Sequence, residues 1–234
     1  MTVTGTSVAG RVVREPRLRN VRGIGLAASW AIAASAAVDV ASAVGDWWTA
    51  QSPAVAAGDA ELRTVDWYNL VTVVLGVGLL VVAPVLFIVW LLRARENSEF
   101  LCDARHYYSR PVGVFGWLVP VAGFWMPCRY VQNVAVASDP AVGPRGAWID
   151  SYKNNTVTTW WVFWLLQSFL GWVAFRTEMG VYDGDPSQLF KVAVVSSIYA
   201  VLSVAGAVFA VLVIRVINRL QSSRPAVPWW HQPQ

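Results

Sequence analysis

Four long apolar runs constrain this chain more than any other feature of its sequence. They cover residues 23–44, 67–92, 158–175 and 189–214. A helix rises about 1.5 Å per residue, so about 17–25 apolar residues cross the ~30 Å hydrocarbon core of a bilayer. All four runs have about that length. The sequence therefore predicts an all-α integral membrane protein with a bundle of four spanning helices.

The composition agrees with this class. The chain is 56% hydrophobic and 14% charged, with a mean hydropathy of +0.47, whereas about a quarter of the residues in soluble domains are charged. Many of the 14 tryptophans lie where a run meets its flank, which is typical of an aromatic belt at the membrane interface. The net charge of +4 lies beside the runs. This placement favours the lipid bilayer and anionic lipid headgroups over nucleic acid as partners.

The positive charges are sorted to one side of the runs. Fifteen of the 18 Lys and Arg residues lie in the N-terminal tail, in the segment between the second and third runs, and in the C-terminal tail. By the positive-inside rule, both termini are expected in the cytoplasm and the protein in the plasma membrane. A fifth span over 111–128 is disfavoured because it contains Pro111, Pro120 and Pro127 and would move basic segments outside.

The chain is expected to form one membrane domain, residues 23–221, with a cytoplasmic segment over 93–157. Residues 1–22 and 222–234 are predicted to be disordered cytoplasmic tails. The first run resembles a secretory signal, but its length and Asp39 favour a span that is retained.

Small residues recur at every fourth position of the first run, at Gly25, Ser29, Ala33, Ala37, Ala41 and Gly45. Small side chains let another backbone approach closely, so this stripe predicts packing against a neighbouring helix. An alanine-rich helix also shows such a stripe by chance. The neighbour is either another run of this chain or a second copy, in a homo-oligomer.

Three charged residues fall inside or at the ends of the runs. Asp39 lies near the outer end of the first run, and Arg176 and Lys191 lie near the outer ends of the third and fourth. Their similar depth predicts an intramembrane ion pair between Asp39 and either Lys191 or Arg176. A proton relay is disfavoured because no titratable residue continues the path through the other runs.

The segment between the second and third runs is predicted to begin as a helix over 93–108. A re-entrant or interfacial stretch follows over 111–126, and a new helix begins at Pro127. Arg93 and Arg95 emerge at headgroup depth, and Arg129 lies one turn into the new helix. A helix N-terminus carries partial positive charge. We therefore expect Arg93, Arg95 and Arg129 to contact one anionic lipid headgroup.

Four spaced motifs lie between residues 90 and 140. They are Trp90-Leu-Leu-Arg93-Ala-Arg95-Glu-Asn97, Gly116-Trp117-Leu-Val-Pro120, Phe124-Trp125-Met-Pro127 and Ala137-Ser138-Asp139-Pro140. Together they resemble a family of bacterial membrane domains of unknown function, found mostly in high-GC Gram-positive bacteria. The resemblance extends over about residues 67–209. It implies an integral membrane protein and carries no activity, cofactor or catalytic residue.

Residues that could support catalysis or bind metal are few. The chain has two histidines, His106 and His231, and two cysteines, Cys102 and Cys128. Metal sites need three or four convergent ligands, and no cluster has that spacing. Cys102 and His106 lie four apart, which suits a nucleophile and its base, but an amphipathic helix explains the spacing better. No catalytic residue, metal site or cofactor is predicted, and the protein is expected not to be an enzyme.

Three function classes remain, and an enzyme is the least favoured of them. The first is a scaffold or accessory protein whose basic cytoplasmic face binds anionic lipid or a membrane protein partner. The second is a small transport or permeation unit, supported by Pro84 inside the second run and by the broken stretch 111–127. A dry interior would favour the scaffold, whereas polar residues facing a shared cavity would favour transport.

Overall fold

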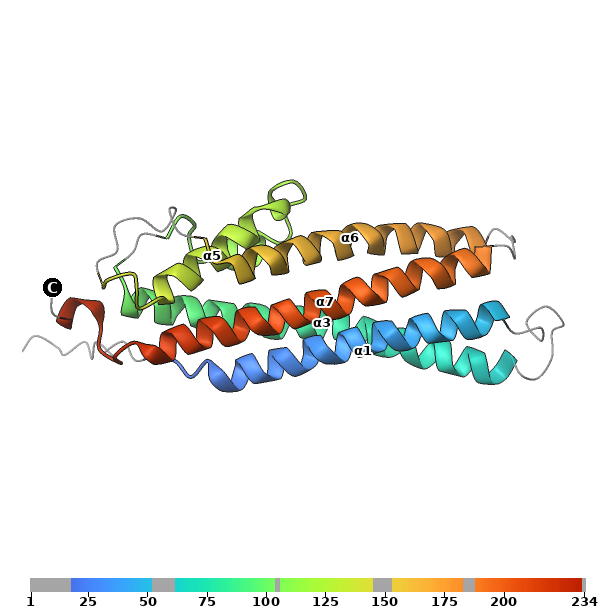
Figure 1. Cartoon of the computed structure of the whole chain (residues 1–234), viewed down its shortest axis with the longest axis horizontal. Coiled ribbons are helices and arrows are strands. Elements are labelled where there is room, and N and C mark those ends of the chain that lie inside the picture. The colour runs from blue at the N-terminus through green and yellow to red at the C-terminus, as the bar shows by residue number, and fades with distance from the viewer. Residues whose placement is uncertain (1–17, 52–61, 104–105, 145–152, 183–187, 233–234) are drawn as a thin grey trace, which may run out of the picture.

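The computed structural model describes residues 18–51, 62–103, 106–144, 153–182 and 188–232. All the regular secondary structure in these residues is helical (Figure 1). Four long helices dominate: α1 (Arg22–Gln51), α3 (Leu62–Leu101), α6 (Asn155–Tyr182) and α7 (Gln188–Ser223). The shorter elements are α4 (Val112–Phe115), η1 (Ala122–Phe124), α5 (Met126–Ser138) and η2 (Trp229–His231).

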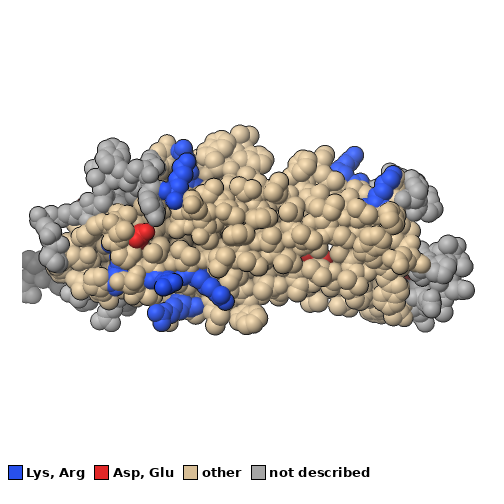
Figure 2. Space-filling view, in the orientation of Figure 1, with Lys and Arg blue, Asp and Glu red and all other residues tan. Residues whose placement is uncertain are grey.

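The four long helices have the length and composition needed to cross a membrane. Their outer surfaces carry large apolar side chains, and Trp30, Leu80 and Val201 are about 70% exposed (69%, 71% and 69%). Figure 2 shows Lys and Arg gathered near the two ends of the visible face, with little charge between them. Such a surface suits hydrocarbon rather than water. The predicted fold class, an all-α membrane protein with four apolar helices, is confirmed.

The helices pack as an open row. α1 lies against α3 on one side and against α7 on the other, and α7 lies against α6. α3 and α6 are thus the two outer helices, and they make little contact with each other. α5 packs against α3, α6 and α7 at one end of the bundle, which we call the α5 end (Figure 1).

The helices extend beyond the apolar runs. α1 continues to Gln51, and α6 begins at Asn155 because Asn154 caps it, accepting a hydrogen bond from the backbone N–H of Thr156 at 3.0 Å. The helix predicted over 93–108 ends earlier, at Leu101. Beyond this residue the backbone N–H of Asp103 donates to the carbonyl oxygen of Pro144 at 2.9 Å instead of continuing the helix.

Residues 111–125 form a hairpin that does not span. The chain turns through α4 and η1 and continues into α5, which begins at Met126 with Pro127 in its first turn, as predicted. Phe115, Leu118 and Val121 on this hairpin are more than half exposed. Together with Phe124 they form an apolar surface that suits lipid.

Buried polar side chains connect the elements at the α5 end. Asn97 on α3 donates to the side chain of Gln221 on α7 at 3.1 Å and to the carbonyl oxygen of Arg19 at 3.0 Å. Gln221 in turn donates to the carbonyl oxygen of Ala94 at 2.7 Å and to Ser138 at 3.0 Å. Asn97 and Gln221 therefore satisfy each other and nearby backbone groups, as an apolar interior requires.

The segment after α7 is anchored. The sequence predicts a disordered tail from residue 222, whereas the structure buries Arg224 and places Trp230 against Phe100, with ring centroids 5.9 Å apart. The predicted N-terminal tail lies outside the described residues up to residue 17.

The stripe of small residues on α1 does not form one packing face. Gly25 and Gly45 are buried, but Ala33 and Ala37 are exposed. A spacing of four turns the stripe by about 40° per step, because a helix advances about 100° per residue. The stripe therefore rotates out of the interface. Ala28, Ala36 and Ala43 are buried in its place.

Candidate functional site

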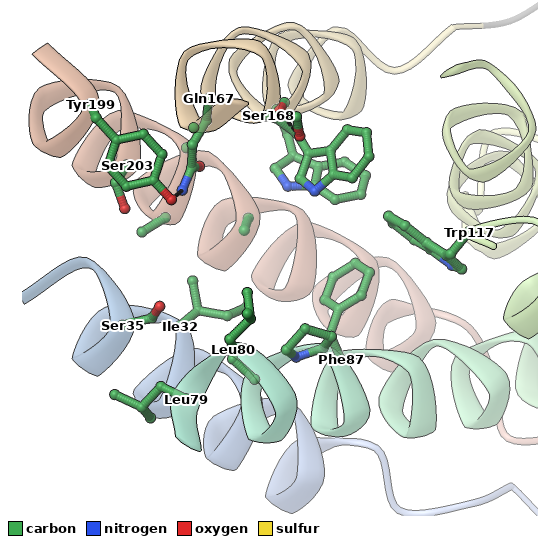
Figure 3. Close-up of a pocket in the computed structure, with 18 of the residues that line it drawn as sticks. Ile32, Ser35, Leu79, Leu80, Phe87, Trp117, Gln167, Ser168, Tyr199 and Ser203 are labelled. Carbon is green, nitrogen blue, oxygen red and sulfur yellow. Dashed lines mark hydrogen bonds between the residues drawn. The ribbon is translucent and has the colours of Figure 1, made fainter. Parts of the chain in front are cut away.

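A cavity of about 450 Å³ lies between α3 and α6, and residues of α1 and α7 also line it (Figure 3). We call it the crevice. It exists because α3 and α6 are the outer helices of the row and diverge from each other. Exposed residues on both walls, Leu80 of α3 and Ser168 of α6, also line it. The crevice is therefore open toward the surroundings of the apolar helices.

An aromatic cluster closes the crevice toward the α5 end. Trp117 on the hairpin packs against Phe87 of α3 and Trp164 of α6, with ring centroids 6.2 and 5.7 Å apart. Phe87 also contacts Trp160 across the crevice, at 5.4 Å. The indole N–H of Trp117 donates to the carbonyl oxygen of Gly113 at 3.0 Å, which fixes the ring.

Polar side chains face the crevice about halfway along α6 and α7. The amide nitrogen of Gln167 donates to the hydroxyl of Tyr199 at 3.3 Å (Figure 3). Ser203 lies one turn beyond Tyr199 on α7, and its hydroxyl donates to the carboxyl group of Asp39 on α1. Ser168 donates to the carbonyl oxygen of Trp164 in its own helix, at 2.8 Å. A cluster of polar groups at this depth is expensive in hydrocarbon and typical of a functional site.

Asp39 does not form the predicted ion pair. Among the described residues it accepts a hydrogen bond from Ser203 and pairs with neither Lys191 nor Arg176. The reason is depth: Lys191 precedes Ser203 by twelve residues, or about 18 Å along the helix. Because α1 extends to Gln51, Asp39 lies deeper than its place in the apolar run indicates. Arg176 and Lys191 instead line a separate hollow of about 610 Å³ between α6 and α7.

Arg93, Arg95 and Arg129 do not form one headgroup site. Arg95 is only 4% exposed; it donates to Glu99 at 2.7 Å and to the carbonyl oxygen of Tyr108 at 3.0 Å. Arg93 lies two residues away, which is about 200° around the helix, and it is half-buried. Arg129 is exposed. Arg95 is therefore a structural residue, and the other two remain available to a headgroup.

A further hollow of about 480 Å³ lies beside Arg95. Cys102 and His106 line it with Glu99, but they do not form a nucleophile and base. His106 contacts Ser98 at 3.4 Å, and its burial beside Arg95 lowers its pKa to about 3. A base this weak cannot deprotonate a thiol near neutral pH.

No group of three His, Cys, Asp or Glu residues that could hold a metal ion occurs within the ranges that the structure describes. The thiol of Cys128 is also unsuited to nucleophilic chemistry, because burial raises its pKa to about 11.

The model of the family described as "Domain of unknown function (DUF4328)" matches residues 52–222. The chain belongs to the DUF4328 family. The match confirms that the chain contains a domain of unknown function, and it covers α3 to α7 but not α1. Neither a curated protein nor a solved structure matches this DUF4328 chain.

Sequence reasoning missed the crevice residues Gln167, Tyr199 and Ser203. One signal was available: Ser196, Tyr199 and Ser203 recur at intervals of three and four within the fourth apolar run, which puts them on one helix face. Which helix they face depends on the row arrangement, and the runs alone do not show that arrangement.

Proposed function

We propose that this DUF4328 protein is a non-enzymatic membrane protein that binds an amphipathic, lipid-like molecule in the crevice. One observation carries this proposal. The crevice lies among apolar helices, is open between α3 and α6, and has a polar cluster halfway along its length. A ligand that partitions into hydrocarbon can enter such a site from the membrane, between α3 and α6. Its polar group then finds hydrogen-bonding partners in the polar cluster.

The size of the crevice suits a small molecule. Small-molecule sites usually measure about 300–1,000 Å³, and the crevice measures about 450 Å³.

Polar residues that face a shared cavity favour the transport or permeation class over a scaffold with a dry interior. Pro84 adds to this argument because it lines the crevice within α3. Proline has no N–H, so the carbonyl oxygen of Leu80 lacks its helical donor. This carbonyl is a further polar group on the α3 wall.

Photo-crosslinking tests the proposal. The probe is hexadecanol with a diazirine in mid-chain, added to the purified protein in detergent. We expect adducts on the walls of the crevice, within residues 79–88 and 160–171, and their loss in Ala207→Phe, which fills the crevice. Val208→Phe is the matched control, because Val208 is 52% exposed and does not line the crevice. Adducts spread over all exposed apolar faces and unchanged in Ala207→Phe would refute the proposal.

A second candidate function rests on the basic surface at the α5 end. Arg22, Arg129, Arg215 and Arg219 are exposed there, on α1, α5 and α7. We propose that this surface, with Arg93, contacts anionic headgroups or a protein partner if this end faces the cytoplasm, as the positive-inside rule indicates.

Native mass spectrometry of retained phosphatidylglycerol tests the second candidate. Arg215→Gln with Arg219→Gln should reduce retention. Arg176→Gln with Lys191→Gln removes the same charge from the opposite end and serves as the control. Equal losses in the two double variants would mean that the α5 end has no special affinity.

A further inference from the structure

We infer that the crevice selects lipid-like molecules whose polar group is a hydroxyl, and that this hydroxyl binds the Gln167–Tyr199 pair. The inference rests on the proposed function and adds the chemical class of the ligand. It follows from which hydrogen-bonding groups the pair leaves free.

Two close approaches between α6 and α7 hold the pair in place. A Cβ atom added at Gly206 would lie 3.1 Å from Oε1 of Gln167, and one added at Gly171 would lie 3.2 Å from Cε2 of Tyr199. Both distances are shorter than ordinary van der Waals contacts of a Cβ atom. Two residues without side chains thus make room for the amide and the phenol, which face the crevice together (Figure 3).

The pair leaves one donor and one acceptor free. The Tyr199 hydroxyl accepts from Gln167, and within the described ranges its own hydrogen and the Gln167 carbonyl oxygen have no protein partner. If the amide is turned over, Tyr199 donates to Gln167, and the amide N–H groups and a phenol lone pair become free. Either orientation offers a ligand both a donor and an acceptor.

A hydroxyl complements such a pair because it accepts one hydrogen bond and donates another. An ester carbonyl or an ether oxygen only accepts, and it would leave the acceptor of the pair without a partner. A carboxylate or phosphodiester likewise only accepts, and it would also lie within about one helical turn of Asp39, which Ser203 holds on the same side of α7. Among the apolar side chains that line most of the crevice, these differences translate into affinity.

The test is competition against the diazirine probe with two ligands of equal chain length, 1-hexadecanol and its methyl ether. The ether keeps the oxygen as an acceptor but has no hydrogen to donate. We expect the alcohol to displace the probe at about three- to tenfold lower concentration than the ether, the factor that one neutral hydrogen bond supplies. The two ligands partition into detergent to the same extents whichever variant is present. The quantity to compare between variants is therefore the ratio of the ether concentration to the alcohol concentration that displaces the probe.

In the double variant Gln167→Leu with Tyr199→Phe, the ratio of the ether concentration to the alcohol concentration that displaces the probe should fall. It should come close to the ratio that partitioning into detergent alone produces. Thr177→Val is the control, because Thr177 does not line the crevice and its hydroxyl donates to the carbonyl oxygen of Val173 in its own helix, and it should keep the wild-type ratio. Displacement by the ether in the double variant shows that the crevice is intact, and Tyr199→Phe alone should give an intermediate ratio.

The outcomes separate the two proposals. If the probe labels the crevice but the ratio is the same in wild type and the double variant, the hydroxyl selectivity is refuted and lipid-like binding stands. If the probe does not label the crevice at all, both proposals fall.

Discussion

Arg224 donates from Nη1 to the carbonyl oxygen of Leu101 at 3.1 Å, although the two residues are 123 positions apart. Leu101 ends α3, where the last carbonyl groups have no partner within the helix. Arg224 also donates to the carbonyl oxygens of Ser138, Asp139 and Val142. One side chain after α7 therefore joins the ends of α3 and α5.

Arg224→Ala should lower the free energy of unfolding by at least about 2 kcal/mol, because buried carbonyl groups lose their donor. Thermal unfolding in detergent measures the effect. Arg219→Ala, at an exposed position on α7, should change the midpoint little. Similar midpoints for both variants would mean that Arg224 does not hold the α5 end together.

Gly25→Ala should destabilise the protein by about 1–3 kcal/mol, as overpacking does. The added Cβ atom would lie 2.8 Å from Nδ2 of Asn218 and 3.0 Å from atoms of Ile214 and Trp90. Gly23→Ala is the matched control, since nothing lies within 4 Å of its added Cβ atom. Alanine favours helix over glycine by up to about 1 kcal/mol, so Gly23→Ala should be neutral or stabilising. A stabilising Gly25→Ala would contradict the close packing of α1.

Stability should fall as the pH is lowered below about 6.5. Burial, with the charge of Arg95, lowers the pKa of His106 from 6.5 to about 3. Between these values the unfolded chain binds a proton at His106 and the folded protein does not, so protonation favours unfolding by up to about tenfold per pH unit. The midpoint of unfolding, measured between pH 7.5 and 5, should fall less in His106→Gln than in wild type. His231→Gln, at an exposed position, should follow the wild type. Parallel curves for wild type and His106→Gln would contradict the prediction.

Cys128 should react slowly with maleimide in the folded protein. Burial raises its pKa to about 11, and only the thiolate is nucleophilic. In a Cys102→Ser background at pH 8, we expect labelling roughly a hundredfold slower than after unfolding in SDS, and about tenfold faster for each added pH unit. Labelling as fast as that of the unfolded chain would show an accessible, ordinary thiol.

The α5 end is expected to face the cytoplasm. Reporter fusions after Asp59 and Gly184 should indicate the outside, and a fusion after Ala147 the inside. An outside signal at Ala147 would contradict both the orientation and the role proposed for the basic surface.

Features that depend on one segment at a time could be predicted from the sequence. The length of an apolar run identifies a helix able to cross a membrane, and the prolines around residues 111–127 identify a segment that turns back. The helix α5 begins within one residue of Pro127, because proline suits the first turn.

Features that depend on how helices face each other could not be predicted from the sequence. Arg95 is an exposed headgroup contact in the sequence interpretation, yet α5 covers it, and its guanidinium group lies 5.1 Å from the ring of Tyr130. Hydropathy predicts where each helix ends but does not register the helices against each other. The sequence therefore predicts a partner for Asp39 at Lys191 or Arg176, whereas Asp39 accepts a hydrogen bond from Ser203. The crevice arises from an open row, and a closed bundle of the same four runs would have had none.

The packing of α1 limits how far the chain can be shortened. The family match begins at residue 52, after the last residue of α1, yet α1 lies against both α3 and α7 and supplies Ile32 and Ser35 to the crevice. A shortened chain limited to residues 52–222 would expose the faces of α3 and α7 that α1 covers. The segment that the family model covers is therefore smaller than the row of four helices, and trimming the protein to the family boundary would remove part of the wall of the crevice.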